Sequence, residues 1–134
     1  MPAFEIALHQ LRPIHAQAVR TLYNTASWWP GRQEQEITQI LDSGPVVGAW
    51  DGELLVGFAR AVSDHHFRAY IEDVIVHPDY QHIGVGNLLL TRLMEALEHI
   101  EIVSLFCEPE LVPFYEQKRF KLISSQRVMH RDSK

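Results

Sequence analysis

The sequence is poor in cysteine, and it contains no long apolar run and no basic cluster. Cys107 is the only cysteine among 134 residues, which excludes an internal disulfide framework and favours a reducing, cytoplasmic location. We recognise no signal peptide and no apolar run near the roughly 18 residues that indicate a membrane span. Twelve basic and seventeen acidic residues give a net charge of −5. This balance argues against a nucleic-acid surface and is compatible with a cationic substrate.

Several common functional signatures are also missing. There is no Gly-X-Gly-X-X-Gly after the first strand and no Gly-Lys followed by Ser or Thr, as a Rossmann fold or a P-loop would need. Eight histidines are present, but none has the spacing of metal ligands or a cysteine partner, so we predict no metal. Cys107 has no cationic sequence neighbour, and we expect a buried strand residue there rather than a nucleophile.

Length and periodicity predict one domain, residues 1–134, with an α/β (α+β) fold. Strands are expected at 4–8, 45–50, 53–62, 69–76, 100–106 and 120–129. Helices are expected from Pro13, over 33–41, after Gly84 and after Pro109. Asp51-Gly52 indicates a type I′ hairpin turn. This order predicts a mixed, mostly antiparallel central sheet of six to seven strands with helices on both faces.

The stretch 71–97 combines a strand, a short loop and a long helix. Strand 69–76 is apolar on both faces, as is typical of a central strand, and Pro78 should end its pairing. The first turn of the following helix has free N–H groups, and glycines at 84 and 86 leave room for a phosphate. The plain alternative is a helix that merely starts after a glycine-containing loop. The apolar stripe of this helix should consist of Val85, Leu88, Leu89, Leu93 and Leu97.

Gln81, Gly84 and Gly86 follow a strand that ends in Val-His-Pro, and this arrangement resembles the pyrophosphate-binding motif of the GNAT acetyltransferase superfamily. The resemblance implies a GNAT-like fold, acetyl-CoA as co-substrate and, often, a homodimer. It also implies that backbone groups of Val74, Ile75 and Val76 bind the pantetheine arm. The pyrophosphate would be bound by Gln81, His82, Ile83, Gly84, Val85, Gly86 and Asn87. His82 replaces a common glycine and could either crowd the diphosphate or hydrogen-bond it.

Glu72 and Asp73 are adjacent acids inside an apolar strand, where a carboxylate is costly unless it is paired or functional. Alternation along the strand should let at most one of them face a given cleft, and a one-residue slip would reverse which. A structural ion pair with Arg60 or Arg68 and a role as general base are both open. The run 71–73 resembles the Leu-Glu-Asp of the polyamine-acetylating branch. That resemblance implies Glu72 as base, through water, and Asp73 as an amine-binding or structural acid.

Tyr115 lies in residues 113–120, which resemble the late Phe-Tyr-Glu-Lys-X-Gly-Phe segment of the superfamily. The resemblance implies that Tyr115 protonates the departing thiolate of coenzyme A. The alternative is an aromatic residue packed on the core with its hydroxyl at the edge. Arg119 replaces the usual glycine, so the helix should end without the favoured left-handed glycine.

Trp28 and Trp29 are candidate substrate contacts, because a half-exposed tryptophan can stack on an aromatic amine or bind an ammonium. Covering the core is the alternative. Residues 28–32 and 48–64 are similar to small bacterial and plastid acetyltransferases, some of which act on arylalkylamines such as serotonin. We therefore predict direct transfer from acetyl-CoA to a small-molecule primary amine, such as a polyamine or arylalkylamine, in a ternary complex. A protein or peptide N-acetyltransferase and a non-catalytic acyl-CoA-binding sensor are the alternatives.

Overall fold

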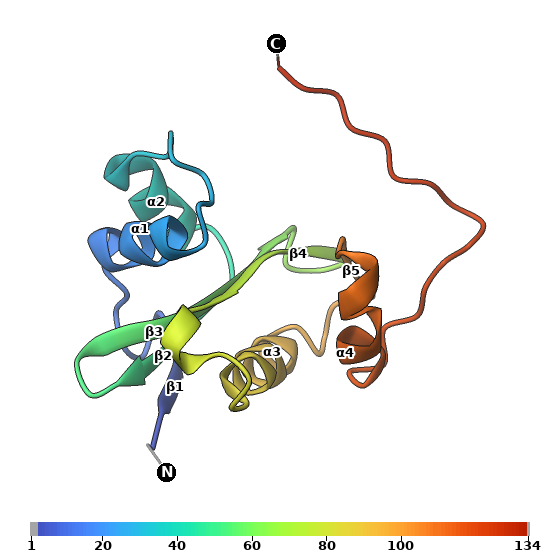
Figure 1. The fold of residues 1–134 in the computed structure, drawn as a ribbon. Helices are drawn as coiled ribbons and strands as arrows, with labels where there is room; N and C mark the ends of the chain where they lie inside the picture. Colours follow the sequence, from blue (N-terminus) through green and yellow to red (C-terminus); the bar gives the residue numbers. More distant parts are fainter. Residues whose placement is uncertain (1–2, 134) are drawn as a thin grey trace.

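The computed structural model describes residues 3–133, which form one five-stranded sheet with helices on both faces (Figure 1). The strands lie side by side in chain order: β1 (Glu5–Leu8), β2 (Val46–Asp51), β3 (Leu54–Ser63), β4 (Arg68–Val76) and β5 (Ile102–Leu105). All neighbours are antiparallel except β4 and β5, which are parallel. The mixed, mostly antiparallel α/β fold is confirmed. The predicted six to seven strands are wrong, because the sheet has five.

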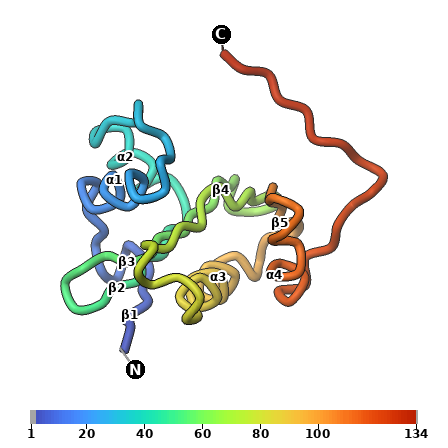
Figure 2. Tube along the Cα trace, in the orientation of Figure 1, coloured from blue at the N-terminus to red at the C-terminus, as the bar shows by residue number. Residues whose placement is uncertain are grey.

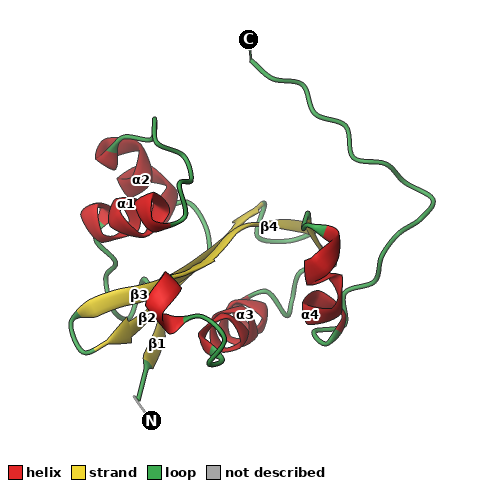
Figure 3. Cartoon of the chain, in the orientation of Figure 1, coloured by secondary structure: helices red, strands yellow, loops and turns green. Residues whose placement is uncertain are grey.

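Helices α1 (Ala16–Thr25) and α2 (Glu34–Leu41) lie on one face of the sheet, and α3 (Val85–Ala96) lies on the other (Figure 3). Two buried clusters follow from this arrangement, one between the sheet and each helical layer. The α3-side cluster includes Val47, Ala49, Val56, Ala59, Ile71, Leu89, Leu90 and Leu93. The α1–α2 cluster includes Val19, Leu22, Tyr23, Ile37, Phe58 and Ile75. Short 3₁₀ helices, η1 (Pro78–Tyr80) and η2 (Pro109–Leu111), precede α3 and α4 (Val112–Glu116).

Local details differ from the sequence-based expectations at three places. Helix α1 begins at Ala16, not at Pro13. The β2–β3 turn has a positive φ at Gly52 (60°) but not at the following residue, so type I′ is wrong and a type II′ turn fits. On α3, Leu88 is 43% exposed whereas Leu90 is buried, so the apolar stripe is turned by part of a helical turn.

The C-terminal segment also differs from the expectation. The strand predicted over 120–129 does not form: all of residues 121–133 are exposed and carry no regular structure. In Figure 2 this red segment leaves α4 and arcs away from the sheet. Cys107 lies just beyond β5 and is exposed, so its predicted burial in a strand is wrong.

A β-bulge interrupts β4 at Glu72. Arg60 of β3 pairs with Asp73, and the next residue, Ala61, pairs with Ile71. Glu72 is therefore an extra residue without a partner on β3, which bends the strand and reverses its alternation. The reversal is visible in the packing, because Ile71 belongs to the α3-side cluster and Ile75 to the α1–α2 cluster, although the two are an even number of residues apart.

Candidate active site

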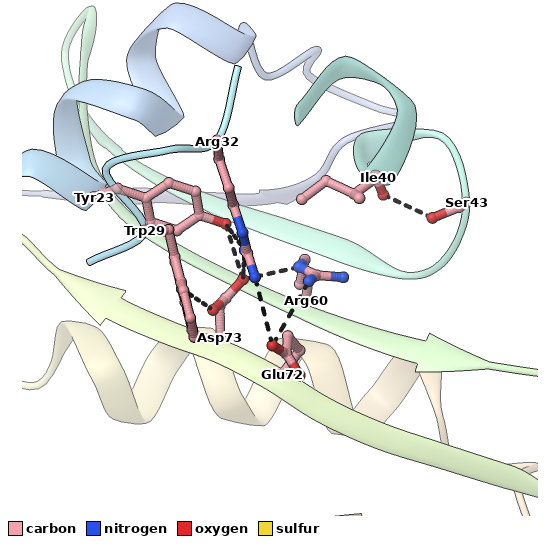
Figure 4. A network of polar contacts seen from close by, with 8 residues as sticks. All are labelled: Tyr23, Trp29, Arg32, Ile40, Ser43, Arg60, Glu72 and Asp73. Atoms are coloured by element: carbon pink, nitrogen blue, oxygen red, sulfur yellow. Dashed lines mark hydrogen bonds and ion pairs between the residues drawn. The ribbon is translucent and has the colours of Figure 1, made fainter. Parts of the chain in front are cut away.

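Asp73 is the centre of a polar network between β4 and the α1–α2 layer (Figure 4). Its side chain is 1% exposed and accepts hydrogen bonds from Tyr23 Oη at 2.9 Å and Arg60 Nε at 2.8 Å, both at Oδ2. Trp29 Nε1 donates to Oδ1 at 3.4 Å. These three donors satisfy the oxygens of a carboxylate that has almost no contact with water. Asp73 therefore anchors α1, the following loop and β3 on β4.

Glu72 lies beside the same two arginines but is more accessible, with 20% of its side chain exposed. Arg32 Nη2 lies 3.8 Å from Glu72 Oε1, and Arg60 Nη2 lies 4.0 Å from the same oxygen. These are ion-pair distances rather than hydrogen bonds. The expectation that only one of the two acids faces a given cleft is wrong, because the bulge places Glu72 and Asp73 beside one pair of cations.

The two arginines of the network are held very differently. Arg60 is nearly buried, with 8% of its side chain exposed, and is fixed on Asp73 by its hydrogen bond. Arg32, from the loop between α1 and α2, is 28% exposed and approaches both carboxylates at 3.8 Å. Its guanidinium donates a hydrogen bond of 3.3 Å to Tyr23 Oη. Arg32 and Tyr23 were not predicted as site residues, because only tertiary contacts bring them to β4.

Trp29 joins this network and Trp28 does not. The Arg32 guanidinium lies 4.2 Å from the centre of the Trp29 ring, which is a cation–π contact. Trp29 is 45% exposed and has a left-handed φ of 51°. Trp28 is 38% exposed, and its backbone N–H donates to the Tyr23 carbonyl at 2.9 Å. A cationic ligand that uses the Trp29 face must compete with Arg32.

Two tyrosines beside the acids have raised pKa values. Burial, followed by the charge of Asp73, raises the pKa of Tyr23 to about 12. Burial, followed by the charge of Glu72, raises the pKa of Tyr70, whose ring packs on Phe106 just after β5. Both phenols therefore remain protonated at neutral pH and can donate hydrogen bonds to the carboxylates.

The second half of β4 has an open edge. The His77 N–H donates to the Val56 carbonyl at 2.8 Å, so alternate residues before it also bond to β3. The backbone groups of Val74 and Val76 are thereby turned toward the opposite edge. On that edge β5 pairs only with residues 68–71. Among the described residues, the outer edge of residues 72–76 has no strand partner, and an extended ligand could bind there.

This arrangement refines the positions expected for the pantetheine arm. The backbone groups of Val74 and Val76 face the gap between β4 and β5, whereas those of Ile75 face β3. The Val76 carbonyl already accepts a hydrogen bond from Gln81 Nε2 at 3.1 Å. Gln81 therefore closes the end of the gap next to the loop that leads into α3.

The loop before α3 has the backbone conformation of an anion site. His82 has a φ of 67° and Gly84 a φ of 97°, both left-handed. Alternating conformations of this kind turn successive N–H groups toward one point. The helical hydrogen bonds of α3 begin with the Leu88 N–H, which donates to the carbonyl of the N-cap residue Gly84. The N–H groups of the first turn are thus available at the positive end of the helix, from Val85, Gly86 and Asn87.

Side chains leave room at this loop for a diphosphate. A Cβ built on Gly84 would have no heavy atom within 4 Å. One built on Gly86 would make ordinary contacts with Val76 Cγ2 (3.7 Å) and Phe114 Cζ (3.9 Å), so the fold alone does not require glycine there. His82 and Ile83 are both exposed at the rim. The open space and the free N–H groups together fit the pyrophosphate implied by the motif.

Tyr115 lies on α4, beyond the end of β5, and packs against the α3-side cluster. Its ring packs edge-to-face against the rings of Phe114 and Phe120, with ring centres 5.0 Å and 5.9 Å away. Burial, with a contribution from nearby Cys107, raises the pKa of Tyr115, so its hydroxyl keeps its proton at neutral pH. Tyr115 thus packs on the α3 side of the sheet, whereas Glu72 pairs with Arg32 from the α1–α2 layer.

The end of α4 has no glycine, as expected, and still has the left-handed geometry. Arg119 itself adopts the left-handed conformation, with a φ of 71°. The Phe120 N–H donates to the Tyr115 carbonyl and the Arg119 N–H to the Glu116 carbonyl, which is the bonding of a Schellman motif. The Phe120–Tyr115 ring contact is the apolar contact typical of that motif. The glycine is missing, but the geometry it favours is kept.

Replacing Arg119 by glycine should stabilise the fold. A left-handed φ costs a non-glycine residue about 1–2 kcal/mol, and part of this is offset by the larger unfolded-state entropy of glycine. We expect Arg119→Gly to raise the free energy of unfolding by about 0.5–1 kcal/mol in urea titrations. Gln117 (φ −64°) is right-handed, so Gln117→Gly should lower it by a similar amount. Equal changes of the same sign would contradict this account of the helix end.

Within residues 3–133, no group of three or more His, Cys, Asp or Glu side chains could hold a metal ion. None of the helices in that range is both long and apolar enough to cross a membrane. A family model described as "Acetyltransferase (GNAT) family" matches residues 8–120. The chain belongs to the GNAT family of acetyltransferases. This is a family of acyltransferases, as the motif at Gln81, Gly84 and Gly86 predicted.

Relatives of this GNAT chain carry several different names. An uncharacterized N-acetyltransferase ycf52 of Pyropia yezoensis is 47% identical over 68 residues, covering 49% of this chain and 39% of its own length. Serotonin N-acetyltransferase 2 of Oryza sativa is 33% identical over 101 residues, covering 70% and 50%. Histone acetyltransferase TAP1 of Glycine max is 32% identical over 107 residues, covering 69% and 46%. The chain thus spans about half the length of these curated relatives or less.

Solved structures share the fold of this GNAT chain. A GNAT-family acetyltransferase of Streptococcus pneumoniae has a TM-score of 0.82 at 24% identity and covers 98% of this chain and 100% of its own. An aminoglycoside N-acetyltransferase in complex with CoA has a TM-score of 0.70 at 16% identity, covering 98% and 95%. At these identities the likeness shows the fold alone.

Proposed function

We propose that this chain is an acetyl-CoA-dependent N-acetyltransferase that acts on a small-molecule primary amine. The observation that carries the proposal is the bulge in β4. It places the partly exposed carboxylate of Glu72 next to Val74 and Val76, whose backbone groups face an edge without a strand partner. A base for the acceptor and a binding edge for an extended acyl donor thus lie on consecutive residues of one strand.

The proposed reaction needs only two proton transfers from this chain. Bound acetyl-CoA supplies a thioester, and the amine nitrogen forms a C–N bond with its carbonyl carbon while the C–S bond breaks. Glu72 accepts the proton that the amine loses, directly or through a water molecule. Tyr115, which its raised pKa keeps protonated, donates its proton to the departing sulfur. No covalent intermediate with the protein is required.

The residues that would contact the donor are those of the open edge and the α3 loop. Val74 and Val76 would hydrogen-bond the pantetheine arm. The residues from Gln81 to Asn87 would hold the pyrophosphate, with backbone N–H groups of the first helical turn as the main donors. The structure of a distant fold relative in complex with CoA supports acetyl-CoA as the donor.

On the acceptor side we propose Trp29 as the principal substrate contact. Trp28 is a second candidate, because it is partly exposed on the same loop. Asp73 is 1% exposed and its oxygens already accept three hydrogen bonds, so we assign it a positioning role behind Glu72 rather than direct contact with the amine. The serotonin acetyltransferase among the relatives supports an arylalkylamine as acceptor, and a polyamine remains the other candidate.

The test is thiol release from acetyl-CoA with a panel of polyamines, arylalkylamines, aminoglycosides, amino acids and short peptides. We expect turnover with one small-amine class and a drop in kcat of about 100-fold in Tyr115→Phe, since the leaving thiolate then lacks its acid. Turnover only with peptides would favour a protein acetyltransferase, for which a histone acetyltransferase relative is the supporting observation. Tight acetyl-CoA binding without turnover, unaffected by Tyr115→Phe, would favour an acyl-CoA sensor and overturn the proposal.

The remaining parts of the proposal concern the setting of the protein. We propose that residues 1–134 act as one N-acetyltransferase domain without a metal or nucleic acid, in the cytoplasm. The exposed free thiol of Cys107 supports a reducing compartment. We also propose a homodimer.

A further inference from the structure

Arg32 places a positive charge where a cationic acceptor would bind. Its guanidinium lies 4.2 Å from the centre of the Trp29 ring, and its Nη2 lies 3.8 Å from Oε1 of Glu72 (Figure 4). Trp29 is the proposed contact of the acceptor, and Glu72 is the proposed base. An aromatic face and a carboxylate are the groups that attract an ammonium ion. Here a cation of the chain itself already lies against both of them.

The contacts of Arg32 are loose compared with those of Arg60. Arg60 is nearly buried, and its Nε–H donates to Asp73 Oδ2 at 2.8 Å. The two carboxylate contacts of Arg32 are each 3.8 Å long, and its guanidinium donates to Tyr23 Oη at 3.3 Å. The Arg32 side chain is also partly exposed, so it can turn into water by rotation about its side-chain bonds. Of the two cations, Arg32 is therefore the one that a ligand can displace.

The charges of the network balance only as long as no further cation enters. Two carboxylates, Glu72 and Asp73, face two guanidiniums, those of Arg32 and Arg60, so the formal charges cancel. A protonated amine beside Glu72 would add an unbalanced positive charge, and repulsion between cations is strong in a partly buried site. Rotation of Arg32 into water removes one positive charge from the network. The formal charges then cancel again with the ammonium bound.

The fold does not depend on the guanidinium of Arg32 in this position. Without it, Asp73 still accepts hydrogen bonds from Tyr23 Oη, Arg60 Nε and Trp29 Nε1. The backbone turn that carries Arg32 is local, since the Arg32 N–H donates to the Trp29 carbonyl at 3.1 Å. The side chain can therefore leave the carboxylates while the loop and Asp73 stay in place.

We propose that Arg32 is an internal competitor of the acceptor, and that the ammonium group of a primary amine without a neighbouring carboxylate takes its place against Trp29 and Glu72. This inference rests on the proposed acetyl transfer and specifies its acceptor more closely. An ammonium is more compact than a guanidinium, so it can reach hydrogen-bond distance of Glu72 Oε1 and give up its proton there.

The ring face of Trp29 that the guanidinium leaves is then free for the aryl or alkyl chain of the acceptor. Arg32 thus determines specificity and does not touch the reacting atoms. A carboxylate next to the amine would lie close to Glu72 and Asp73 and be repelled by both, which disfavours α-amino acids as acceptors.

The first test measures binding alone, without acetyl-CoA. Phenethylammonium is titrated into the full chain and into Arg32→Gln by isothermal titration calorimetry. Removing the competitor should raise the affinity by about 10-fold or more, because the binding-competent state is no longer a minor fraction of the molecules. Arg32→Lys keeps a cation and should bind the probe nearly as weakly as the full chain. Arg20→Gln is the matched control: it removes a cation of the same helical layer that pairs with Glu34, and it should leave the affinity unchanged.

Steady-state kinetics at saturating acetyl-CoA separate competition from catalysis. Arg32→Gln should lower the KM of phenethylamine about 10-fold and change kcat by less than about 3-fold, because the proposed base and acid are both kept. In the full chain, kcat/KM for phenylalanine, which has a carboxylate beside its amine, should be lower than that for phenethylamine by about 10-fold or more. A melting curve of each variant checks that its fold is kept.

Two results would overturn the proposal. If folded Arg32→Gln bound phenethylammonium no more tightly than the full chain, Arg32 would not hold the place of the acceptor. If Arg32→Gln raised the KM and the full chain preferred phenylalanine, Arg32 would bind an anionic group of the acceptor instead of competing with its ammonium. Absence of turnover with every amine would overturn the proposed acetyl transfer, and the binding comparison would still decide the role of Arg32.

Discussion

Gly84→Val should weaken coenzyme A binding by about 100-fold or more, which corresponds to about 2.8 kcal/mol. Gly84 stands at the start of α3, where free N–H groups and the helix dipole would hold the pyrophosphate. A Cβ there points into open space, which is the space that the diphosphate would occupy. The branched side chain would therefore exclude the ligand rather than collide with the protein. Isothermal titration calorimetry with coenzyme A measures the change.

Gly52→Val is the matched control for this experiment. Gly52, in the β2–β3 turn, also has a left-handed φ (60°) and also has no heavy atom within 4 Å of a built Cβ. Both variants should lose a similar amount of stability, since a left-handed φ disfavours valine by about 1–2 kcal/mol. Only Gly84→Val should lose affinity for coenzyme A. Equal affinities in the two folded variants would remove the main support for a pyrophosphate site at α3.

Glu72→Gln should lower kcat by about 100- to 1000-fold, the range expected when a general base is removed. Glutamine keeps the size of the side chain and its position at the bulge but cannot accept the proton of the amine. The arginine contacts of Glu72 are ion pairs of 3.8 and 4.0 Å rather than hydrogen bonds, so the fold should tolerate the change. Steady-state rates with saturating acetyl-CoA, together with a melting curve, separate turnover from stability.

Asp73→Asn provides the contrast with Glu72→Gln. Removing this charge leaves Arg60 buried without its close partner, and breaking a buried ion pair costs about 3–5 kcal/mol. We expect a large loss of stability from Asp73→Asn and a large loss of turnover from Glu72→Gln. If Glu72→Gln retained full turnover on the best amine, Glu72 would not be the base.

Much of the loop and helix that we propose as the binding site of the acyl donor could be predicted from local sequence. Gly84 and Gly86, the preceding strand and the following helix are specified by short-range chemistry: a left-handed residue, free N–H groups in one helical turn, and an apolar period. The α2 helix and the β2–β3 hairpin were likewise predicted within a few residues, because periodicity and turn residues report on structure over a short span.

The arrangement of side chains around Glu72 and Asp73 was decided by tertiary structure. The alternation of side chains along β4 predicted that Glu72 and Asp73 separate, but the pairing of Arg60 with Asp73 and of Ala61 with Ile71 inserts a bulge between them. A bulge depends on the partner strand, which a single strand's pattern does not contain. For the same reason the sequence did not point to Arg32 and Tyr23, whose side chains reach β4 only through the packing of α1 and its following loop.

The C-terminal segment shows the same division. Its composition predicted a strand over residues 120–129, yet these residues lie off the sheet, because a strand forms only where an edge is within reach. The sequence by itself determined the local devices: the glycine loop, the helix that follows it, and the apolar faces. The tertiary structure alone decided which acids, cations and strand edges meet, since long-range contacts set the register and the register sets where each side chain points.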